Sequence, residues 1–196
     1  IFPNSNSGYG VCGEDLCTED YPLNPISVYG KTKCEAEKAV LTHGNSVVFR
    51  LATAFGTSPR MRFDLLVNDF TRRAVRDRAV ILFQPEFRRN FVHVRDIARA
   101  FMFAMEHFDK MRGQVYNLGL DSANMNKRQL CEEIKAVVPD FTWIESPIGE
   151  DIDKRDYLVS SEKLRQTGFE ARISLREGIE EVIKACAIYR DANANA

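Results

Sequence analysis

The sequence lacks several features that mark particular classes of protein. No apolar stretch reaches the roughly 18 residues needed to span a membrane, and no signal peptide is visible. No basic run is long and the formal net charge is −1, so nucleic acid is not an expected partner. The 196 residues suffice for one sizeable core, or for one domain and a small lobe. We therefore expect a globular protein located in the cytoplasm.

A metal-ligand pattern is also missing. The five cysteines are an odd number scattered along the chain, and the three histidines lie far apart in the sequence. Cys12 and Cys17 could form half of a metal site, but four residues separate them and no second ligand pair follows. We therefore expect no metal, and we expect reduced thiols in a cytosolic protein.

A third absence concerns glycine. A nucleotide-binding α/β domain opens with a strand, a glycine-rich turn and a helix. The sequence contains no Gly-x-x-Gly-x-x-Gly, and it begins at Ile1 inside an apolar run that is typical of a buried strand. If other motifs indicate such a domain, we expect its first half, on the order of a hundred residues, to precede this sequence.

Periodicity and capping signals predict alternating strands and helices, which is an α/β fold. Strands are expected within 1–8 and at 46–51, 80–83, 88–93 and 141–144. Helices are expected at 28–43, 62–77, 96–108, 126–138, about 161–167 and about 175–190, and loops at 10–27 and 53–59. Ser27 is the expected N-cap of the first helix, whose apolar side would consist of Val28, Ala36, Ala39 and Val40.

The stretch Tyr29-Gly30-Lys31-Thr32-Lys33 organises the rest of the interpretation. Tyr29 and Lys33 are four residues apart, so they lie on one face of a helix about one turn from each other. An ammonium beside a phenol favours the phenolate, which lets the phenol exchange a proton with a substrate hydroxyl. This spacing alone is common by chance, and a plain surface helix is the alternative.

A strand that ends in Ser5 is followed by Tyr9-Gly10, by an acidic and proline-containing loop, and by Tyr29-Gly30-x-x-Lys33. This order of motifs resembles the extended short-chain dehydrogenase/reductase family, the NAD-dependent nucleotide-sugar epimerases and dehydratases. The resemblance continues almost to the C-terminus, and it implies a strand at 114–119. It implies the C-terminal part of a Rossmann-type parallel sheet at 1–60. It also implies a small α/β substrate-binding lobe, mainly 61–196, with some segments returning to the Rossmann domain.

The resemblance implies roles for three residues. Tyr29 would act as the base on a sugar hydroxyl, and Lys33 would hold the nicotinamide ribose, so both would also contact the cofactor. Ser5 would hydrogen-bond the hydroxyl that is oxidised, although a simple turn cap is the alternative for this serine. NAD is the implied cofactor, and NADP is not excluded because the residues that discriminate between them lie outside this sequence.

The resemblance also implies substrate contacts. Residues 88–100 and 154–157 match two family segments in which an arginine binds the substrate diphosphate, here Arg89 and Arg155. A guanidinium suits this task because it forms bidentate, charge-assisted hydrogen bonds. Asp156 could instead pair with Arg155 in a plain salt bridge.

Two further substrate contacts are implied less directly. Thr53 stands where the family often has asparagine, and Asn68 lies in a region that contacts the nucleotide. An exposed helical asparagine is the alternative for Asn68. We expect His93 to be a packing residue and Asp96 to be a helix cap.

One departure from the family pattern distinguishes its reactions. The 4,6-dehydratases carry Asp-Glu after the Ser/Thr, whereas Asn6 and Ser7 stand here, so elimination lacks its expected acid. The resemblance therefore implies an epimerase that works through a transient keto-sugar, with C4 favoured and C2 left open. A keto-sugar reductase, a 4,6-dehydratase and a non-catalytic nucleotide-sugar-binding relative are the alternatives. Relatives pair through the helix at Tyr29, so a homodimer is implied.

Overall fold

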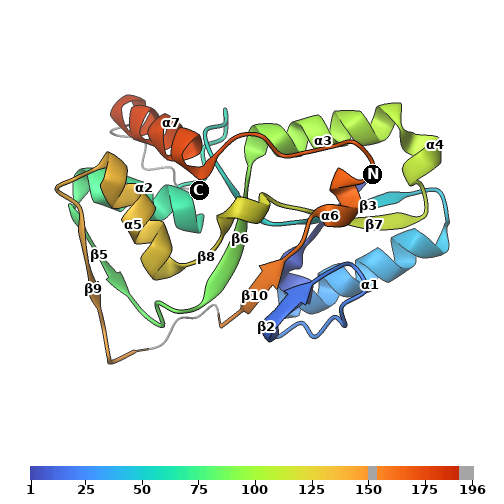
Figure 1. Ribbon diagram of the computed structural model, residues 1–196, viewed down its shortest axis with the longest axis horizontal. Helices are drawn as coiled ribbons and strands as arrows, with labels where there is room; N and C mark the ends of the chain where they lie inside the picture. Colours follow the sequence, from blue (N-terminus) through green and yellow to red (C-terminus); the bar gives the residue numbers. More distant parts are fainter. Residues whose placement is uncertain (150–153, 190–196) are drawn as a thin grey trace.

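The computed structural model describes residues 1–149 and 154–189 (Figure 1). The strands are β1 (Phe2–Ser5), β2 (Val11–Cys17), β3 (Val47–Leu51), β4 (Thr53–Phe55), β5 (Ala79–Leu82), β6 (Arg88–His93), β7 (Gln114–Leu118), β8 (Asn124–Asn126), β9 (Thr142–Glu145) and β10 (Asp156–Val159). The helices are α1 (Val28–Thr42), α2 (Leu66–Arg76), α3 (Val94–Glu106), α4 (Phe108–Met111), α5 (Lys127–Val137), α6 (Glu162–Arg165) and α7 (Leu175–Ile188), with short 3-10 turns η1 (Asn6–Gly8) and η2 (Asp121–Ala123). The predicted α/β fold is confirmed.

A parallel sheet in the order β1-β3-β7 forms the first part of the structure. Alternate residues of β3 point to opposite faces of this sheet. Val47 and Phe49 pack with α3 in one hydrophobic cluster, whereas Arg50 points toward α1. Figure 1 accordingly shows α3 and α1 on opposite sides of β3 and β7. The sheet therefore has one apolar face and one face that carries a buried charge.

The second part of the structure lies on the left of Figure 1, where α2, α5 and α7 gather beside the parallel pair β5-β9. Its core is the larger hydrophobic cluster, with side chains from all three helices, among them Phe70, Leu130 and Ile179. The strand β6 connects the two parts, because it pairs in parallel with β4 and antiparallel with β8. Ser7, just after β1, contacts Arg155, just before β10, and Thr53, the first residue of β4 after β3, lines one cavity with Arg89 of β6.

Two predicted loops contain strands, so those predictions were wrong in part. Within 10–27 the chain forms β2, which pairs in parallel with β10, and within 53–59 it forms β4, which pairs with β6. The register of the first pair shifts between Val11 and Leu16, and no alternating apolar pattern marks this segment. Both strands are stabilised by partners far away in sequence, so local composition could not predict them.

The predicted apolar side of α1 was wrong in part, since Ala36 and Val40 are half-buried but the other two residues are not. Val28 is 78% exposed and Ala39 is exposed, whereas Gly30, Cys34 and Glu37 form the buried face. The helix turns a glutamate inward because Arg50 on β3 supplies an opposite charge. The predicted N-cap is confirmed, since the Gly30 amide donates to Ser27 Oγ at 3.0 Å.

Asp96 stabilises the structure, but not as a helix cap. The N-cap of α3 is His93, whose Nδ1 accepts the Arg95 amide at 3.1 Å. The Asp96 carboxylate is buried and accepts the amides of Arg172 and Ile173 at 3.0 and 2.8 Å. It therefore fastens the segment before α7 to α3, a contact that no sequence spacing indicates.

Gly178 allows α7 to pack closely on the sheet, and this predicts a cost for Gly178→Ala. A Cβ at this position would lie 2.2 Å from a ring atom of Phe55 and 3.0 Å from His93. We expect the free energy of unfolding to fall by about 1–3 kcal/mol, measured by urea denaturation. The same substitution should cost less in a Phe55→Leu background. A neutral or stabilising effect would contradict this packing.

Candidate functional site

The sequence-predicted catalytic residues lie together at the end of β1. Ser5 is the last residue of that strand, and Tyr29 and Lys33 come from the first two turns of α1. Gly30 permits this approach, because a Cβ there would lie 3.0 Å from the Ser7 carbonyl oxygen and 2.9 Å from Pro25. The Tyr-Gly pair thus brings the start of α1 against the turn that follows Ser5.

Lys33 lies between β1 and Tyr29. Its Nζ donates to the Pro3 carbonyl at 2.8 Å and lies 5.9 Å from the centre of the Tyr29 ring. The Tyr29 side chain is 55% exposed, so its phenol is accessible to a ligand. The structure confirms the shared helical face, while the catalytic roles of both residues stay predictions.

Ser5 caps the short turn η1. Its Oγ accepts the Ser7 amide at 3.1 Å and lies 2.8 Å from Ser7 Oγ. Ser7 Oγ in turn accepts a hydrogen bond from the guanidinium of Arg155. Ser5 therefore does cap the turn, as the alternative for this serine predicted. Its hydroxyl keeps the capacity for a further hydrogen bond to a ligand.

A buried ion pair fixes α1 to the sheet. Arg50 and Glu37 meet at 2.6 and 3.1 Å, with side chains only 6% and 5% exposed. Asn4 donates to the same carboxylate at 2.5 Å, and Arg50 donates to the Tyr9 hydroxyl at 3.0 Å. Burial raises the pKa of Tyr9, so this phenol stays protonated and serves as a neutral hydrogen-bonding group. Sequence reasoning missed this network.

Three of the four predicted substrate residues line one cavity of about 230 Å³. They are Thr53, Arg89 and Arg155, and Lys127 joins them. Lys127 is the first residue of α5, is buried, and donates to the Phe83 carbonyl at 2.7 Å. Sequence reasoning missed it because nothing local distinguishes this lysine from a surface one. Asp64 and Asp69 line the same cavity, but each carboxylate is paired with an arginine outside it, Arg62 and Arg73. The three cations come from three separate segments, and such a set suits a diphosphate.

Arg89 also holds the segment that carries Arg155. Arg89 is buried and donates to the carbonyls of Arg88 and Arg155. Asp156 does not form the alternative salt bridge with Arg155, because its carboxylate receives two bonds from the Arg88 guanidinium at 2.9 and 3.0 Å. That pairing holds the pKa of Asp156 below its usual value despite the opposing effect of burial.

The structure does not bring Asn68 to this cavity. The residue is buried in α2, so the exposed alternative is wrong. Its Oδ1 accepts the Gly56 amide at 3.1 Å, and its Nδ2 donates to the carbonyls of Gly56 and Arg62. Asn68 therefore holds the loop that follows β4, and its substrate contact stays a prediction.

His93 is a packing residue, as expected. It is fully buried and meets the Phe55 ring edge-on at 5.3 Å between centroids. Burial, with a contribution from Arg95, lowers the pKa of His93 to about 4. Its Nδ1 accepts the Arg95 amide, so the ring is neutral and Nε2 donates to Glu181 at 3.0 Å.

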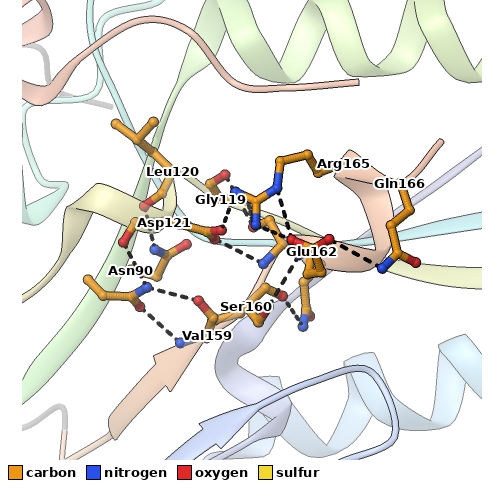
Figure 2. A network of polar contacts seen from close by, with 12 residues as sticks. Asn90, Gly119, Leu120, Asp121, Val159, Ser160, Glu162, Arg165 and Gln166 are labelled. Atoms are coloured by element: carbon orange, nitrogen blue, oxygen red, sulfur yellow. Dashed lines mark hydrogen bonds and ion pairs between the residues drawn. The ribbon is translucent and has the colours of Figure 1, made fainter. Parts of the chain in front are cut away.

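A polar network joins the end of β7 to β10 and α6 (Figure 2). Asp121 accepts the Ser161 amide at 2.9 Å and pairs with Arg165 at 3.1 Å. Asn124 forms two bonds with the backbone of Val159, at 2.8 and 2.9 Å. A cavity of about 290 Å³ lies beside this network. The charged groups of the network, Asp121, Glu162 and Arg165, are paired with each other. We therefore infer that the network holds β10, the strand that follows Arg155, in place.

Three glycines in the segment from η1 to β2 have a spacing known from dinucleotide-binding folds. Gly8, Gly10 and Gly13 match Gly-x-Gly-x-x-Gly, which in dinucleotide-binding folds precedes a helix. Here the segment leads into β2, so no helix N-terminus is available for a phosphate at this point of the described chain. Gly10 instead has φ +73° and lies against the Asn24 carbonyl. Gly10 thus serves the turn between η1 and β2, whereas Gly13 lies within β2.

The described residues contain neither a metal-binding cluster nor a membrane-spanning helix. Residues 1–149 and 154–189 hold no group of three or more His, Cys, Asp or Glu side chains that could bind a metal. No helix in the same ranges is long and apolar enough to cross a membrane. The Cys12 and Cys17 sulfurs lie 2.7 Å apart and both thiols are free and buried.

Comparison with known proteins identifies the relatives. Residues 1–119 match the model of the NAD dependent epimerase/dehydratase family. The glycan biosynthesis protein Agl12 of Haloferax volcanii is 25% identical over 92% of this chain and 58% of its own length. The dTDP-D-glucose 4,6-dehydratase of Mus musculus is 21% identical over 94% and 54%. The chain therefore spans little more than half the length of these curated relatives.

A solved structure gives a matching fold. The UDP-glucose 4-epimerase of Thermotoga maritima with UDP-glucose superposes with a TM-score of 0.82 at 25% identity. The match covers 97% of this chain and 63% of that one. The curated relatives and this structure thus include both a dehydratase and an epimerase.

Proposed function

The chain belongs to the NAD dependent epimerase/dehydratase family, and we propose that it epimerises a nucleotide-diphosphate sugar, at C4, through a transient keto-sugar. The observation that carries the proposal is the contact from Ser5 through Ser7 to Arg155. It joins the place where a sugar hydroxyl would react to the cavity of Arg89, Lys127 and Arg155 where a diphosphate would bind.

The residues at the end of β1 fit a nicotinamide cofactor. Ligands of open α/β sheets bind outside the carboxyl ends of parallel strands, and Ser5, Tyr29 and Lys33 lie at such an end. The exposed phenol and the ammonium suit the ribose hydroxyls, and bound NAD supplies reversible hydride transfer. The phosphates of the dinucleotide would be bound by the segment that the relatives have and that this chain does not span.

In the proposed mechanism each residue acts on the sugar at a stated atom. Tyr29 Oη removes the proton of the sugar hydroxyl that is oxidised and returns it after the sugar has been presented by its other face. Lys33 Nζ holds the phenol and the ribose in place. Ser5 Oγ hydrogen-bonds the reacting oxygen. The arginines bind the diphosphate, so most of the binding energy comes from a part of the substrate remote from the reacting carbon.

Epimerisation is favoured over elimination by the residues beside Ser5. Asn6 and Ser7 are both buried and carry no ionisable group, and residues 5–13 contain no carboxylate. Elimination of water needs a general acid at the leaving hydroxyl. The Glu37 carboxylate, which lies behind β1, is occupied by Arg50.

The reaction is tested by giving UDP-, GDP-, CDP- and dTDP-sugars to the full-length protein and following each by NMR. An epimer that forms without net consumption of dinucleotide supports the proposal. A 4-keto-6-deoxy product would identify a dehydratase, and stoichiometric loss of added NAD(P)H would identify a reductase. Return of every sugar unchanged would overturn the proposed activity.

Arg89→Met is expected to weaken binding of the matching nucleoside diphosphate about 10- to 100-fold, measured by calorimetry. The reason is that a hydrogen bond to a charged phosphate contributes more than one between neutral groups. Arg112→Met is the matched control, because Arg112 is exposed and lies outside the cavity. Equal affinity of both variants would remove Arg89 from the phosphate site.

A further inference from the structure

Three polar groups form a chain in which the direction of each hydrogen bond is constrained. Arg155 Nη1 contacts Ser7 Oγ, and Ser7 Oγ lies 2.8 Å from Ser5 Oγ. A guanidinium has only donors, so Ser7 Oγ accepts from Arg155. Ser5 Oγ already accepts the Ser7 amide at 3.1 Å. The one undetermined proton is the proton shared between the two serine hydroxyls.

Burial decides where that proton lies. Ser7 is 1% exposed, and among the described residues its Oγ contacts only Ser5 and Arg155. If Ser5 donated to Ser7, the Ser7 proton would have no acceptor, and a buried donor left without a partner costs about 1–3 kcal/mol. The Ser7 hydroxyl therefore donates to Ser5.

This direction leaves Ser5 with one defined role. A serine hydroxyl has two acceptor lone pairs and one donor proton. The amide and the hydroxyl of Ser7 fill both lone pairs of Ser5, so Ser5 can only donate to a further group. A donor at this place suits the oxygen of the keto-sugar, which accepts but cannot donate.

We propose that Ser7 is a positioning residue that fixes Ser5 as a hydrogen-bond donor to the reacting sugar oxygen. The inference rests on the proposed function and deepens it. Arg155 then has two tasks: it lines the diphosphate cavity and it orients the pair of serines. Occupancy of the phosphate site and the direction of the Ser5 hydroxyl are thereby connected through a single side chain.

The test compares Ser7→Ala, Ser7→Thr and Ser5→Ala in the full-length protein. We expect Ser7→Ala to lower kcat about 10- to 100-fold, as for loss of an oriented donor, with KM changed less than about threefold. Ser7→Thr should restore most of kcat because it restores the hydroxyl. UDP, GDP, CDP and dTDP are tried in calorimetry, and Ser7→Ala should keep wild-type affinity for the one that binds, whereas Arg155→Met should lose affinity.

The outcomes separate the two proposals. Wild-type turnover in Ser7→Ala, with Ser5→Ala inactive, would overturn the role of Ser7 while leaving the proposed function intact. An equal loss in Ser7→Ala and Ser7→Thr, with a lowered unfolding midpoint in both, would also overturn it, because it would indicate a packing effect. A wild-type protein without turnover on any nucleotide-sugar would overturn the proposed function, and the role of Ser7 with it.

Discussion

Tyr29→Phe should lower turnover of the nucleotide-sugar by at least about 100-fold, because general acid-base catalysis by a positioned side chain contributes about 10²- to 10⁴-fold. The substitution removes only the hydroxyl and keeps the ring that lies 5.9 Å from Lys33 Nζ. Tyr29 is exposed at the start of α1 and makes no side-chain hydrogen bond within the described residues. Its stability contribution should therefore be small, and kcat should fall at nearly constant KM.

The control for this prediction is Tyr189→Phe, which makes the same chemical change at the end of α7, away from β1. Turnover of this variant should equal that of the wild type. Circular dichroism and unfolding midpoints should not distinguish either variant from the wild type. Turnover of Tyr29→Phe within about threefold of the control would remove Tyr29 from the proton transfer.

Glu37→Leu should cost about 3–5 kcal/mol of the free energy of unfolding. It leaves the Arg50 guanidinium buried without its carboxylate, and breaking one side of a buried pair has this magnitude. Asn4 is buried too and loses the acceptor of its 2.5 Å bond. Because this pair attaches α1 to β1 and β3, the variant should also lose the alignment of Tyr29 with Ser5. Urea denaturation measures the loss of unfolding free energy. Turnover at urea concentrations below the unfolding midpoint measures the loss of alignment.

Two comparisons make this prediction specific. Asp64→Leu breaks the exposed pair with Arg62, whose side chains are 56% and 63% exposed, and should cost at most about 1 kcal/mol. The double variant Glu37→Leu, Arg50→Met should recover part of the loss, since it removes the uncompensated charge. A cost for Glu37→Leu no larger than that for Asp64→Leu would contradict the assigned importance of the buried pair.

Local signals predicted the elements that carry the reacting residues. Ser27 caps α1 because its side chain accepts a backbone amide only three residues away, a contact that depends on local sequence alone. The apolar runs of β3 and β7 also stand nearly where expected. The expected end of the last helix at Arg190 lies outside the described residues.

Other features depend on partners distant in sequence. The strand β2 exists because β10 pairs with it, and Asn68 is buried because the loop at Gly56 needs its amide group. Glu37 faces inward because Arg50 stands on the adjacent strand. In each case the residue type favours solvent or a loop, and a contact made only in the folded chain overrides that preference.

The sequence by itself therefore determined the α/β class, the helical face shared by Tyr29 and Lys33, and, through the order of its motifs, the family. These depend on short-range spacing, which folding leaves unchanged. Only the tertiary structure decided that Arg89, Lys127 and Arg155 surround one cavity, and that Ser7 links it to Ser5. These contacts depend on how strands and helices pack. Packing brings together side chains that are far apart in the sequence, so their spacing along the chain does not predict the contact.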